Sequence, residues 1–361
     1  MVYKAIGLMS GSSLDGLDIA YAHFQEIAGK WSVELKNTLC LEYDDAWSKR
    51  LSESTHLNAF DYQLLHVEFG HYLGQCVNAF IEENGLHHQV AMIASHGHTT
   101  FHHPELKMTS QLGEGAAIAA ETGLAVISDL RALDVALGGQ GAPIVPMGEK
   151  RLFGEYDLLL NLGGIANISI REDDEYIAFD VCSANAVLNR LAAKAGFDYD
   201  DEGRLAVEGT LDQQLLDELN NLDYYAKHPP KSLDNSFASS IIYPIIEKYG
   251  LSVSDALRTY VEHIILQIQW SIHPFLSASF PSPANMLITG GGAFNTFLIK
   301  KLEEVLMGKI LIVVPDAGVV KFKEAMIMAF LGVLRWREEY TVLSSVTGAT
   351  KNSIGGALWL G

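Results

Sequence analysis

The sequence is poor in positive charge and in cysteine. Its 361 residues include 25 Lys and Arg against 44 Asp and Glu, a formal net charge of −19. Because clustered basic side chains bind nucleic acids and anionic lipid surfaces, we expect neither a nucleic acid nor a membrane as a partner. The three cysteines, Cys40, Cys76 and Cys182, form no CxxC pair. Such spacing is typical of a reducing compartment rather than of a disulfide framework.

Long apolar runs are also missing. The longest covers residues 325–334 and is closed by Arg335, whereas a membrane-spanning helix needs about 18 or more apolar residues. The N-terminal residues show no basic stretch followed by a long apolar one, so we expect no secretory signal. With 48% hydrophobic residues, the chain can still bury sizeable cores. We predict a cytoplasmic protein of about two domains, given ~150 residues per domain.

The common nucleotide and zinc motifs are absent: no Walker A loop, no GxGxxG and no HExxH. Three glycine-rich turns are present instead, each directly after a predicted strand, at residues 7–18, 161–167 and 289–295. Glycine permits close backbone approach to a ligand, and successive N–H groups form anion-binding nests. An acidic protein without a basic patch would hold a polyphosphate with such amides and a metal ion. The alternative is that each is an ordinary hairpin or strand–helix turn.

The predicted elements repeat in order. Hydrophobic periodicity predicts three strands, then helix, strand, helix and strand, in each half of the chain. The elements of the first half lie at residues 3–9, 18–24, 31–43, 62–80, 90–94, 116–122 and 124–128. Those of the second half lie at 156–162, 166–171, 175–180, 185–195, 255–276, 286–289, 294–306 and 310–314, followed by an all-apolar helix at 324–335. This alternation predicts an α/β fold with duplicated lobes.

We place the N-terminal lobe at residues 1–152 plus 345–361 and the C-terminal lobe at 153–344. Residues 198–209 and 227–236 have the composition of loop insertions in the second lobe.

Eight segments resemble anhydro-N-acetylmuramic acid kinases. They are GLMSGSSLDGLD, SHGHTTFHHP, SDLRALDVALGGQGAPIVP, NLGGIANISI, PPKS, ITGGGAFN, KEAMIMAFL and SVTGA, in family order from Gly7 to Ala349. The family belongs to the superfamily of sugar kinases, actin and heat-shock chaperones. The resemblance therefore implies two lobes of actin-like, ribonuclease H-like architecture, with ATP and the active site in the cleft between them. Family members tend to be dimers, so a homodimer is expected.

The resemblance also implies how ATP and Mg²⁺ are held. The first two turns would bind the phosphates, through Gly11, Ser12, Ser13, Leu14, Asp15, Gly16, Leu17 and Asp18 and through Asn161, Gly163, Gly164 and Asn167. The third turn would face the adenosine, through Gly290, Gly291, Gly292 and Asn295. Asp18 would hold Mg²⁺ directly or through water. The alternative for Asp15 and Asp18 is that they are turn and helix-cap aspartates.

Asp180 ends a predicted strand and is the candidate general base, the alternative being a helix N-cap. In the family, the aspartate of this Phe-Asp segment is the catalytic base. It would take a proton from the water that attacks the anomeric carbon and opens the 1,6-anhydro bridge, and the released O6 would accept the γ-phosphoryl group.

Three further residues are candidates for sugar contacts: Thr99, Arg131 and Glu324. Arg131 could pair bidentately with the lactyl carboxylate of a muramic acid, or form an ion pair with Asp129 or Asp134. By resemblance Glu324 hydrogen-bonds the sugar; otherwise it suits the dipole of a first helical turn. Thr99 matches a sugar-contacting position, or is a plain strand-end hydroxyl.

The chain departs from the family at three places. Residues 181–184, Val-Cys-Ser-Ala, replace Thr-Gly-Pro-Gly; residues 113–115, Gly-Glu-Gly, replace Gly-Asp-Pro; and His98 replaces a common glutamine. Four other hypotheses remain open. They are a kinase of another 1,6-anhydrosugar such as levoglucosan, a non-catalytic ATP-binding switch, a zinc hydrolase using His96, His98, His102 and His103, and a Cys182 nucleophile.

Overall fold

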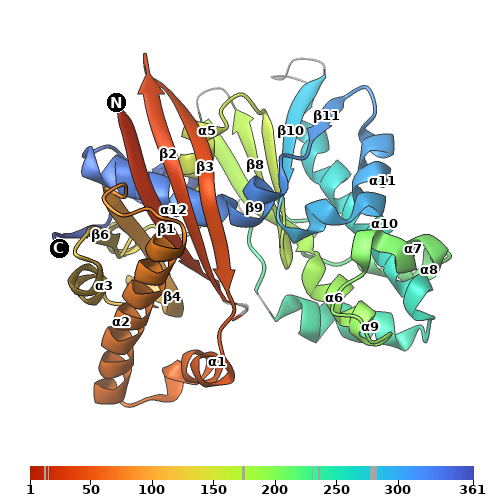
Figure 1. Cartoon of the computed structure of the whole chain (residues 1–361). Helices are drawn as coiled ribbons and strands as arrows, with labels where there is room; N and C mark the ends of the chain where they lie inside the picture. The colour runs from red at the N-terminus through yellow and green to blue at the C-terminus, as the bar shows by residue number, and fades with distance from the viewer. Residues whose placement is uncertain (12–13, 15, 173–174, 230, 235, 277–282) are drawn as a thin grey trace. The chain divides into compact units, whose positions relative to one another are not determined.

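The computed structural model describes residues 1–11, 14, 16–172, 175–229, 231–234, 236–276 and 283–361. These form two compact units, each built around its own sheet (Figure 1). Unit 1 comprises Met1–Gly154 and Phe322–Gly361, and unit 2 comprises Glu155–Lys321. The first boundary lies close to the predicted one. The second was wrong, because residues 322–344 belong to unit 1.

The sheet of unit 1 has the strand order β12-β6-β4-β1-β2-β3, with β5 added against β4. β1 and β2 are antiparallel, as are β2 and β3, whereas β1, β4 and β6 are parallel. The strands are β1 (Val2–Ser10), β2 (Leu17–Ile27), β3 (Lys30–Leu41), β4 (Met92–His103), β5 (Met108–Leu112), β6 (Ala125–Ser128) and β12 (Ala357–Trp359). The helices are α1 (Asp45–Ser52), α2 (Ala59–Glu83), α3 (Gly115–Thr122), α4 (Ala132–Ala136), α5 (Val145–Leu152) and α13 (Ser344–Thr347).

Helices cover both faces of this sheet, following the alternation of side chains along β1. Ile6 and Leu8 belong to the apolar core that α2 and α3 share. Gly7 points the other way, toward α12 (Ala317–Trp336), where an added Cβ would lie 1.8 Å from the carbonyl oxygen of Ala325. Only glycine permits that approach.

The C-terminal part of α12 explains the corrected boundary. The ring of Phe330 packs on Phe24 of β2 and Trp31 of β3, with ring centres 5.3 and 5.0 Å apart. Gly332 lies so close to Ala94 of β4 that an added Cβ would be 2.6 Å from the alanine Cβ. A helix apolar on all sides is predictable from sequence, but the sheet it covers is decided by tertiary packing.

Unit 2 repeats the same connectivity. Its sheet has the order β11-β10-β7-β8-β9. β8 pairs antiparallel with both β7 and β9, whereas β10 pairs parallel with both β7 and β11. The strands are β7 (Leu158–Leu162), β8 (Ile165–Glu172), β9 (Glu175–Ser183), β10 (Ala284–Thr289) and β11 (Ile310–Val313). The same five-stranded order in both units confirms the predicted duplicated α/β architecture of the actin-like, ribonuclease H-like type.

The helices of unit 2 lie between these strands and pack on one large apolar core. They are α6 (Asn185–Ala193), α7 (Arg204–Glu208), α8 (Gln213–Asn220), a π-helical turn (Ala238–Ile242), α9 (Tyr243–Lys248), α10 (Val253–Ile272) and α11 (Thr296–Leu306). The predicted insertion at 198–209 thus contains a helix. Its start is held by Asp200, whose carboxylate accepts from the amides of Leu205 and Ala206 at 2.8 and 3.0 Å.

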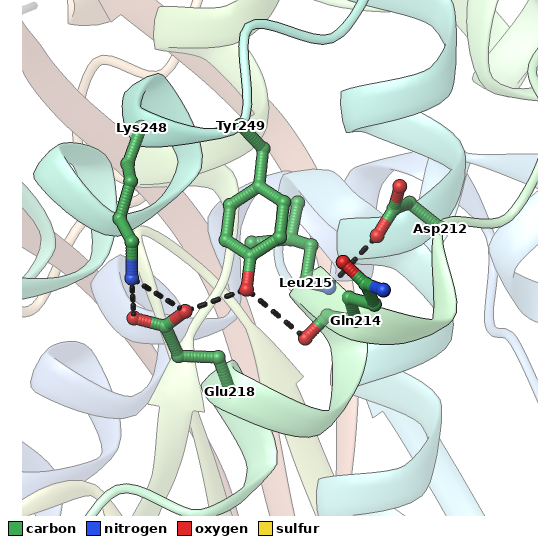
Figure 2. A network of polar contacts seen from close by, with 6 residues as sticks. All are labelled: Asp212, Gln214, Leu215, Glu218, Lys248 and Tyr249. Carbon is green, nitrogen blue, oxygen red and sulfur yellow. Dashed lines mark hydrogen bonds and ion pairs between the residues drawn. The ribbon is translucent and has the colours of Figure 1, made fainter.

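A surface network joins α8 to the end of α9 (Figure 2). Lys248 donates to both carboxylate oxygens of Glu218 at 2.8 and 2.9 Å, and the hydroxyl of Tyr249 donates to the same carboxylate at 2.6 Å. Asp212 caps α8 by accepting from the amide of Leu215. Because Lys248 is exposed, this pair contributes at most about 1 kcal/mol.

The histidine-rich segment is a strand rather than a loop. β4 continues through His103 and forms a hairpin with β5, in which Phe101 lies opposite Ser110. The alternation of Thr, Phe and His side chains suits a partly exposed strand, which the sequence analysis did not assign. Among the helices within the described ranges, none has the length and apolar character needed to cross a membrane.

Candidate active site

The first glycine-rich turn joins β1 to β2 in unit 1. Of its residues, Ser12, Ser13 and Asp15 lie outside the described residues. Leu14 has a left-handed backbone with φ 61°, and its amide donates to the carbonyl of Gly11 at 3.4 Å. Gly16 lies against β3, where an added Cβ would be 2.4 Å from the carbonyl oxygen of Leu41. Leu17 and Asp18 then begin β2.

A buried hydrogen-bond network anchors this turn. The hydroxyl of Tyr43 donates to Oγ of Ser10 at 2.7 Å, and Ser10 Oγ lies 3.0 Å from Nδ1 of His98. The hydroxyl of Ser10 therefore joins Tyr43 to the imidazole, and burial lowers the pKa of His98. Asp18 is half-buried on β2, opposite Met9 of β1 and Cys40 of β3.

A row of polar residues crosses the sheet of unit 2. Thr289 of β10 lies opposite Asn161 of β7, Asn161 opposite Asn167 of β8, and Asn167 opposite Asp180 of β9. Directly opposed residues share one face of a sheet. Their apolar neighbours along the strands point to the other face and form the core, among them Leu160, Leu162, Ile168, Phe179 and Ile288. The topology thus gathers the second turn's two asparagines and the candidate base on one face.

Asp180 is held at three atoms. Its amide donates to the carbonyl of Lys231 at 3.1 Å, its carbonyl accepts from the hydroxyl of Tyr224 at 2.7 Å, and its Oδ2 accepts from the amide of Leu233 at 2.8 Å. Burial raises the pKa of the Asp180 carboxyl, and the amide of Leu233 partly opposes that shift. A half-buried carboxylate of raised proton affinity and fixed orientation suits a general base.

The backbone beside Asp180 contains a β-bulge. Asn167 pairs with Asp180 and Ala166 with Cys182, which leaves Val181 as the extra residue. β9 therefore continues to Ser183, and α6 begins only at Asn185, so Asp180 is neither the strand end nor a helix cap. Val181 and Cys182, two of the residues at which the chain departs from the family pattern, form part of this bulge.

Cys182 does not suit a nucleophile. Its side chain is fully buried in the core of unit 2, and burial raises the pKa of the thiol well above its usual range. A reactive cysteine needs an accessible thiolate, which this site disfavours.

The second and third turns lie against each other within unit 2. The carbonyls of Gly163 and Gly164 accept from the first amides of α6, which leaves the amide side of the turn suited to an anion. Asn185 donates from Nδ2 to the carbonyl of Leu162 at 2.9 Å. Gly290 has φ +81°, and an added Cβ would lie 2.6 Å from Oδ1 of Asn161.

The other residues of the third turn, Gly291 and Gly292, form a short 3₁₀ turn before α11. Asn295 caps α11 through a 3.0 Å bond from the amide of Leu298. Its side chain therefore has a structural role in the described state.

Substituting Gly290 tests how tightly these turns are packed. Gly290→Ala is expected to weaken ATP binding and to lower the unfolding temperature of the protein, because both a positive φ and a backbone clash oppose the new Cβ. Gly308→Ala is the matched control: its φ is +75°, but an added Cβ meets nothing within 4 Å. The free energy of unfolding of this variant should fall only by the roughly 1–2 kcal/mol that an alanine in the left-handed conformation costs. Equal unfolding temperatures and ATP affinities would show that the close approach is unimportant.

Arg131 is the centre of a cluster in unit 1. Its Nε donates to Nε2 of His96 at 2.8 Å, and its Nη1 donates to the carbonyl of Gly141 at 2.7 Å. Burial lowers the pKa of the guanidinium to about 10, and Glu324 opposes that shift. Asp134, one expected ion-pair partner, instead accepts from the amide of Gly141 at 2.8 Å. The guanidinium thus stays charged at neutral pH.

Glu324 lies well inside α12, beyond the first turn that begins at Ala317, so the helix dipole does not account for it. Burial raises the pKa of its carboxyl, which Lys323 and Arg131 partly oppose. The neighbouring Lys323 forms a buried ion pair with Glu149 of α5, at 2.7 Å. Thr99 lies within β4 rather than at its end, opposite Gln111 of β5.

The four clustered histidines each have partners of their own. His96 contacts Arg131 and Gly97, His98 contacts Ser10, His102 contacts Thr109, and His103 contacts Glu105. Within the part of the chain that the structure describes, no group of three His, Cys, Asp or Glu side chains could hold a metal ion. This arrangement does not support the zinc-hydrolase hypothesis.

The site includes residues that sequence reasoning missed. Tyr224 and Leu233 hold Asp180, and nothing in the local sequence of Tyr224 signals this role. Leu233 follows the PPKS segment, whose resemblance was the one available signal. His96 was considered only as a zinc ligand, whereas the structure makes it a hydrogen-bond acceptor for Arg131.

Comparisons with known proteins show the family of this chain. The model of the family "Anhydro-N-acetylmuramic acid kinase" matches residues 3–361. Proteins of that name from Hydrogenovibrio crunogenus and Vibrio parahaemolyticus are 33% and 32% identical, each over 98% of this chain and 97% of the relative. Among solved structures, the activator of the 2-hydroxyisocaproyl-CoA dehydratase from Clostridium difficile with bound ADPNP is similar with a TM-score of 0.47 and 11% identity, over 93% of this chain and 96% of that one.

Proposed function

The chain belongs to the anhydro-N-acetylmuramic acid kinase family, and from this premise we propose which of its residues carry out the reaction. It is a phosphotransferase with an alcohol acceptor that uses ATP. It hydrolytically opens 1,6-anhydro-N-acetylmuramic acid and phosphorylates O6, which gives N-acetylmuramic acid 6-phosphate for cell-wall sugar recycling. The observation that carries the residue assignment is Asp180, fixed at three atoms in one row with Asn161 and Asn167.

Asp180 acts as the general base. Its Oδ2 is engaged by the amide of Leu233, so Oδ1 is the oxygen assigned to a water molecule. The carboxylate takes a proton from that water, whose oxygen forms a bond to the anomeric carbon while the bond from this carbon to O6 breaks. O6 then attacks the γ-phosphorus, and ADP leaves with the electrons of the broken P–O bond. Positioned proton abstraction contributes about 10²–10⁴-fold.

The nucleotide is held by main-chain groups of the three turns. The phosphate contacts are assigned to the residues of the first turn, Gly11 to Asp18, and to Asn161, Gly163, Gly164 and Asn167 of the second. Gly290, Gly291, Gly292 and Asn295 are assigned to the adenosine. Gly290 of the third turn lies close to Asn161 of the second. This closeness supports assigning the phosphate contacts of the second turn and the adenosine contacts of the third turn to one nucleotide.

Mg²⁺ accompanies ATP in this proposal. A magnesium ion usually takes one or two protein carboxylates and completes its shell with phosphates and waters. The single half-buried carboxylate of Asp18 fits that donor set, directly or through water. When bound, the ion neutralises charge on the phosphates.

Arg131, Thr99 and Glu324 are assigned to the sugar. The positive charge of Arg131 suits the lactyl carboxylate, and Glu324 and Thr99 suit hydroxyl or amide groups. The muramic acid assignment predicts that Arg131→Ala raises KM for the lactyl-bearing sugar by about 10- to 100-fold, the effect of one charge-assisted contact. A levoglucosan kinase would instead show nearly unchanged kinetics with its own substrate, which has no acid group.

An ATP-coupled assay with several anhydrosugars tests the function directly. In ¹⁸O-labelled water, mass spectrometry of rapidly quenched product should find one label at the anomeric carbon and none in the phosphate ester. Product incubated in labelled water without enzyme controls for exchange. ATP binding without turnover of any anhydrosugar would favour the switch hypothesis instead.

The raised pKa of Asp180 predicts the acid limb of the pH profile. The base must be ionised, so kcat should be retained above the pKa of this carboxyl and fall as the pH decreases through it. Because burial raises that pKa, the fall should begin at a higher pH than for an ordinary aspartate. A profile of kcat against pH measures it. A rate that stays constant down to the pKa of an ordinary aspartate, about 3.9, would contradict a raised pKa.

Two properties extend beyond this site. The acidic composition and the lack of CxxC pairs support a cytoplasmic location, away from nucleic acid and membrane. A homodimer is proposed from the resemblance, and sedimentation velocity would test it.

A further inference from the structure

The two hydrogen-bond acceptors that hold Arg131 are both neutral. One is the imidazole of His96 and the other is the main-chain carbonyl of Gly141. Buried arginines are usually paired with carboxylates, which satisfy the guanidinium but cancel its charge. Here the orientation is fixed while the positive charge is kept.

The state of His96 follows from its two bonds. Nδ1 lies 2.8 Å from the carbonyl of Gly97, which can only accept, so Nδ1 carries the proton. Nε2 is then the lone pair that accepts from Arg131 Nε. Burial and the neighbouring Arg131 lower the pKa of His96 to about 3, so the ring is neutral at neutral pH. Gly97 has φ +73°, a backbone available to few other residues.

The second tether is also rigid. The amide of Gly141 donates to Oδ2 of Asp134, and Oδ1 of Asp134 accepts from the hydroxyl of Thr347 at 2.8 Å. Asp134 is fully buried. The carbonyl that accepts from Arg131 therefore belongs to a loop fixed from both sides.

Counting donors shows which edge of the guanidinium remains. Arginine has five N–H groups. Among the residues that the structure describes, His96 takes Nε–H and Gly141 takes one Nη1–H, so the three remaining donors lie on Nη1 and Nη2. A carboxylate can then bind bidentately only end-on, across Nη1 and Nη2, and not side-on across Nε and Nη2.

We infer that His96 is a positioning and specificity-determining residue: its neutral imidazole occupies Nε of Arg131 and presents the charged Nη1/Nη2 edge to an anionic substituent of the sugar. This inference rests on the proposed role of Arg131. The groups that face the pair include Glu324, which interacts with Arg131 electrostatically, and the imidazoles of His98 and His102. Selectivity for an acidic sugar is expected to depend on the neutrality of the acceptor as much as on its geometry.

The test compares two sugars that differ only in the acid. These are 1,6-anhydro-N-acetylmuramic acid and 1,6-anhydro-N-acetylglucosamine, which lacks the lactyl ether. The measured quantity is the ratio of their kcat/KM values, in which the fraction of correctly folded enzyme cancels. The variants are His96→Gln, which keeps a neutral acceptor, His96→Ala, which removes it, and His96→Glu, which keeps an acceptor but adds a negative charge.

His96→Ala is expected to lower the ratio by about 10- to 100-fold, mostly through KM for the acidic sugar. His96→Gln should stay within about threefold of the unmodified protein, since its neutral carbonyl can accept from Nε. His96→Glu should fall at least as far as His96→Ala, because it neutralises the guanidinium. A ratio in His96→Ala within about twofold of the unmodified protein, or a His96→Glu ratio equal to that of His96→Gln, would overturn the inference.

Arg131→Ala separates this inference from the function it rests on. If Arg131→Ala lowers the ratio but His96→Ala does not, the proposed function stands and the role of His96 is wrong. If Arg131→Ala leaves the ratio unchanged, the assignment of Arg131 to the lactyl group fails instead.

Discussion

Asp180→Asn is expected to abolish most turnover while ATP affinity and folding stability are kept. The amide oxygen of asparagine can still accept from the amide of Leu233, so the local geometry survives. What is lost is the proton acceptor, at a cost of about 10²–10⁴-fold in kcat. ATP binding by calorimetry and sugar turnover by the coupled assay measure the two effects separately.

The stability of the same variant has a definite sign. The folded-state pKa of Asp180 is raised, so its contribution to stability is present below the unfolded pKa and is lost as the pH rises through the folded one. At neutral pH the buried charge is therefore unfavourable. Asp180→Asn should unfold at an equal or slightly higher temperature at pH 7 than the unmodified protein. Near-normal turnover in the variant would remove Asp180 as the base.

Lys323→Met is expected to cause the largest loss of stability. The side chains of Lys323 and Glu149 are only 4% and 5% exposed, and their ion pair is 2.7 Å long. Removing the lysine takes its positive charge away from the buried carboxylate of Glu149, which costs about 3–5 kcal/mol. The double variant Lys323→Met with Glu149→Leu should recover most of that loss, because two apolar side chains can replace a buried pair. Differential scanning calorimetry gives the comparison.

An exposed pair in unit 2 supplies the control. Lys248→Met breaks the bond to Glu218 shown in Figure 2, where the lysine side chain is 63% exposed. The free energy of unfolding should fall by less than about 1 kcal/mol in this variant. If the two lysine variants unfolded at the same temperature, burial would not be what gives the Lys323 pair its importance.

The ion pair also bears on the site through Glu324. Lys323 is one of the charges that keep the pKa of Glu324 from rising further. Its removal should raise that pKa, so that Glu324 holds its proton to a higher pH. A shift of the acid limb of kcat/KM for the sugar to higher pH in Lys323→Met, measured at a temperature where this variant is folded, would report the coupling. The double variant does not isolate it, because Glu149 raises the same pKa and is removed there as well.

The order of elements could be predicted from sequence because its signals are local. Alternating apolar residues define β1 and β7, 3.6-residue spacing defines α10 and α11, and glycines mark the turns between strands. Those signals predicted the same five strands twice, and the sheets confirm them. They failed at the β4–β5 hairpin, where histidines and threonines occupy strand positions, and at the short helix α7.

The candidate site divides in the same way. Asp180 and Arg131 were identified from their motifs, and their residue roles stay predictions until the assays above are done. Their hydrogen-bond partners were not predictable. Leu233 lies 53 residues from Asp180, and His96 lies 35 residues from Arg131. Thr347 meets Asp134 across 213 residues.

By itself, then, the sequence determined the types and order of most elements, the glycine turns and the acidic net charge, because each depends on neighbouring residues or on composition. Only the tertiary structure decided that residues 322–344 belong to unit 1, that Val181 bulges beside Asp180, and that a neutral histidine holds Arg131. The physical reason is that a buried polar group takes whatever partner packing brings within hydrogen-bond distance, and a linear pattern carries no record of that partner.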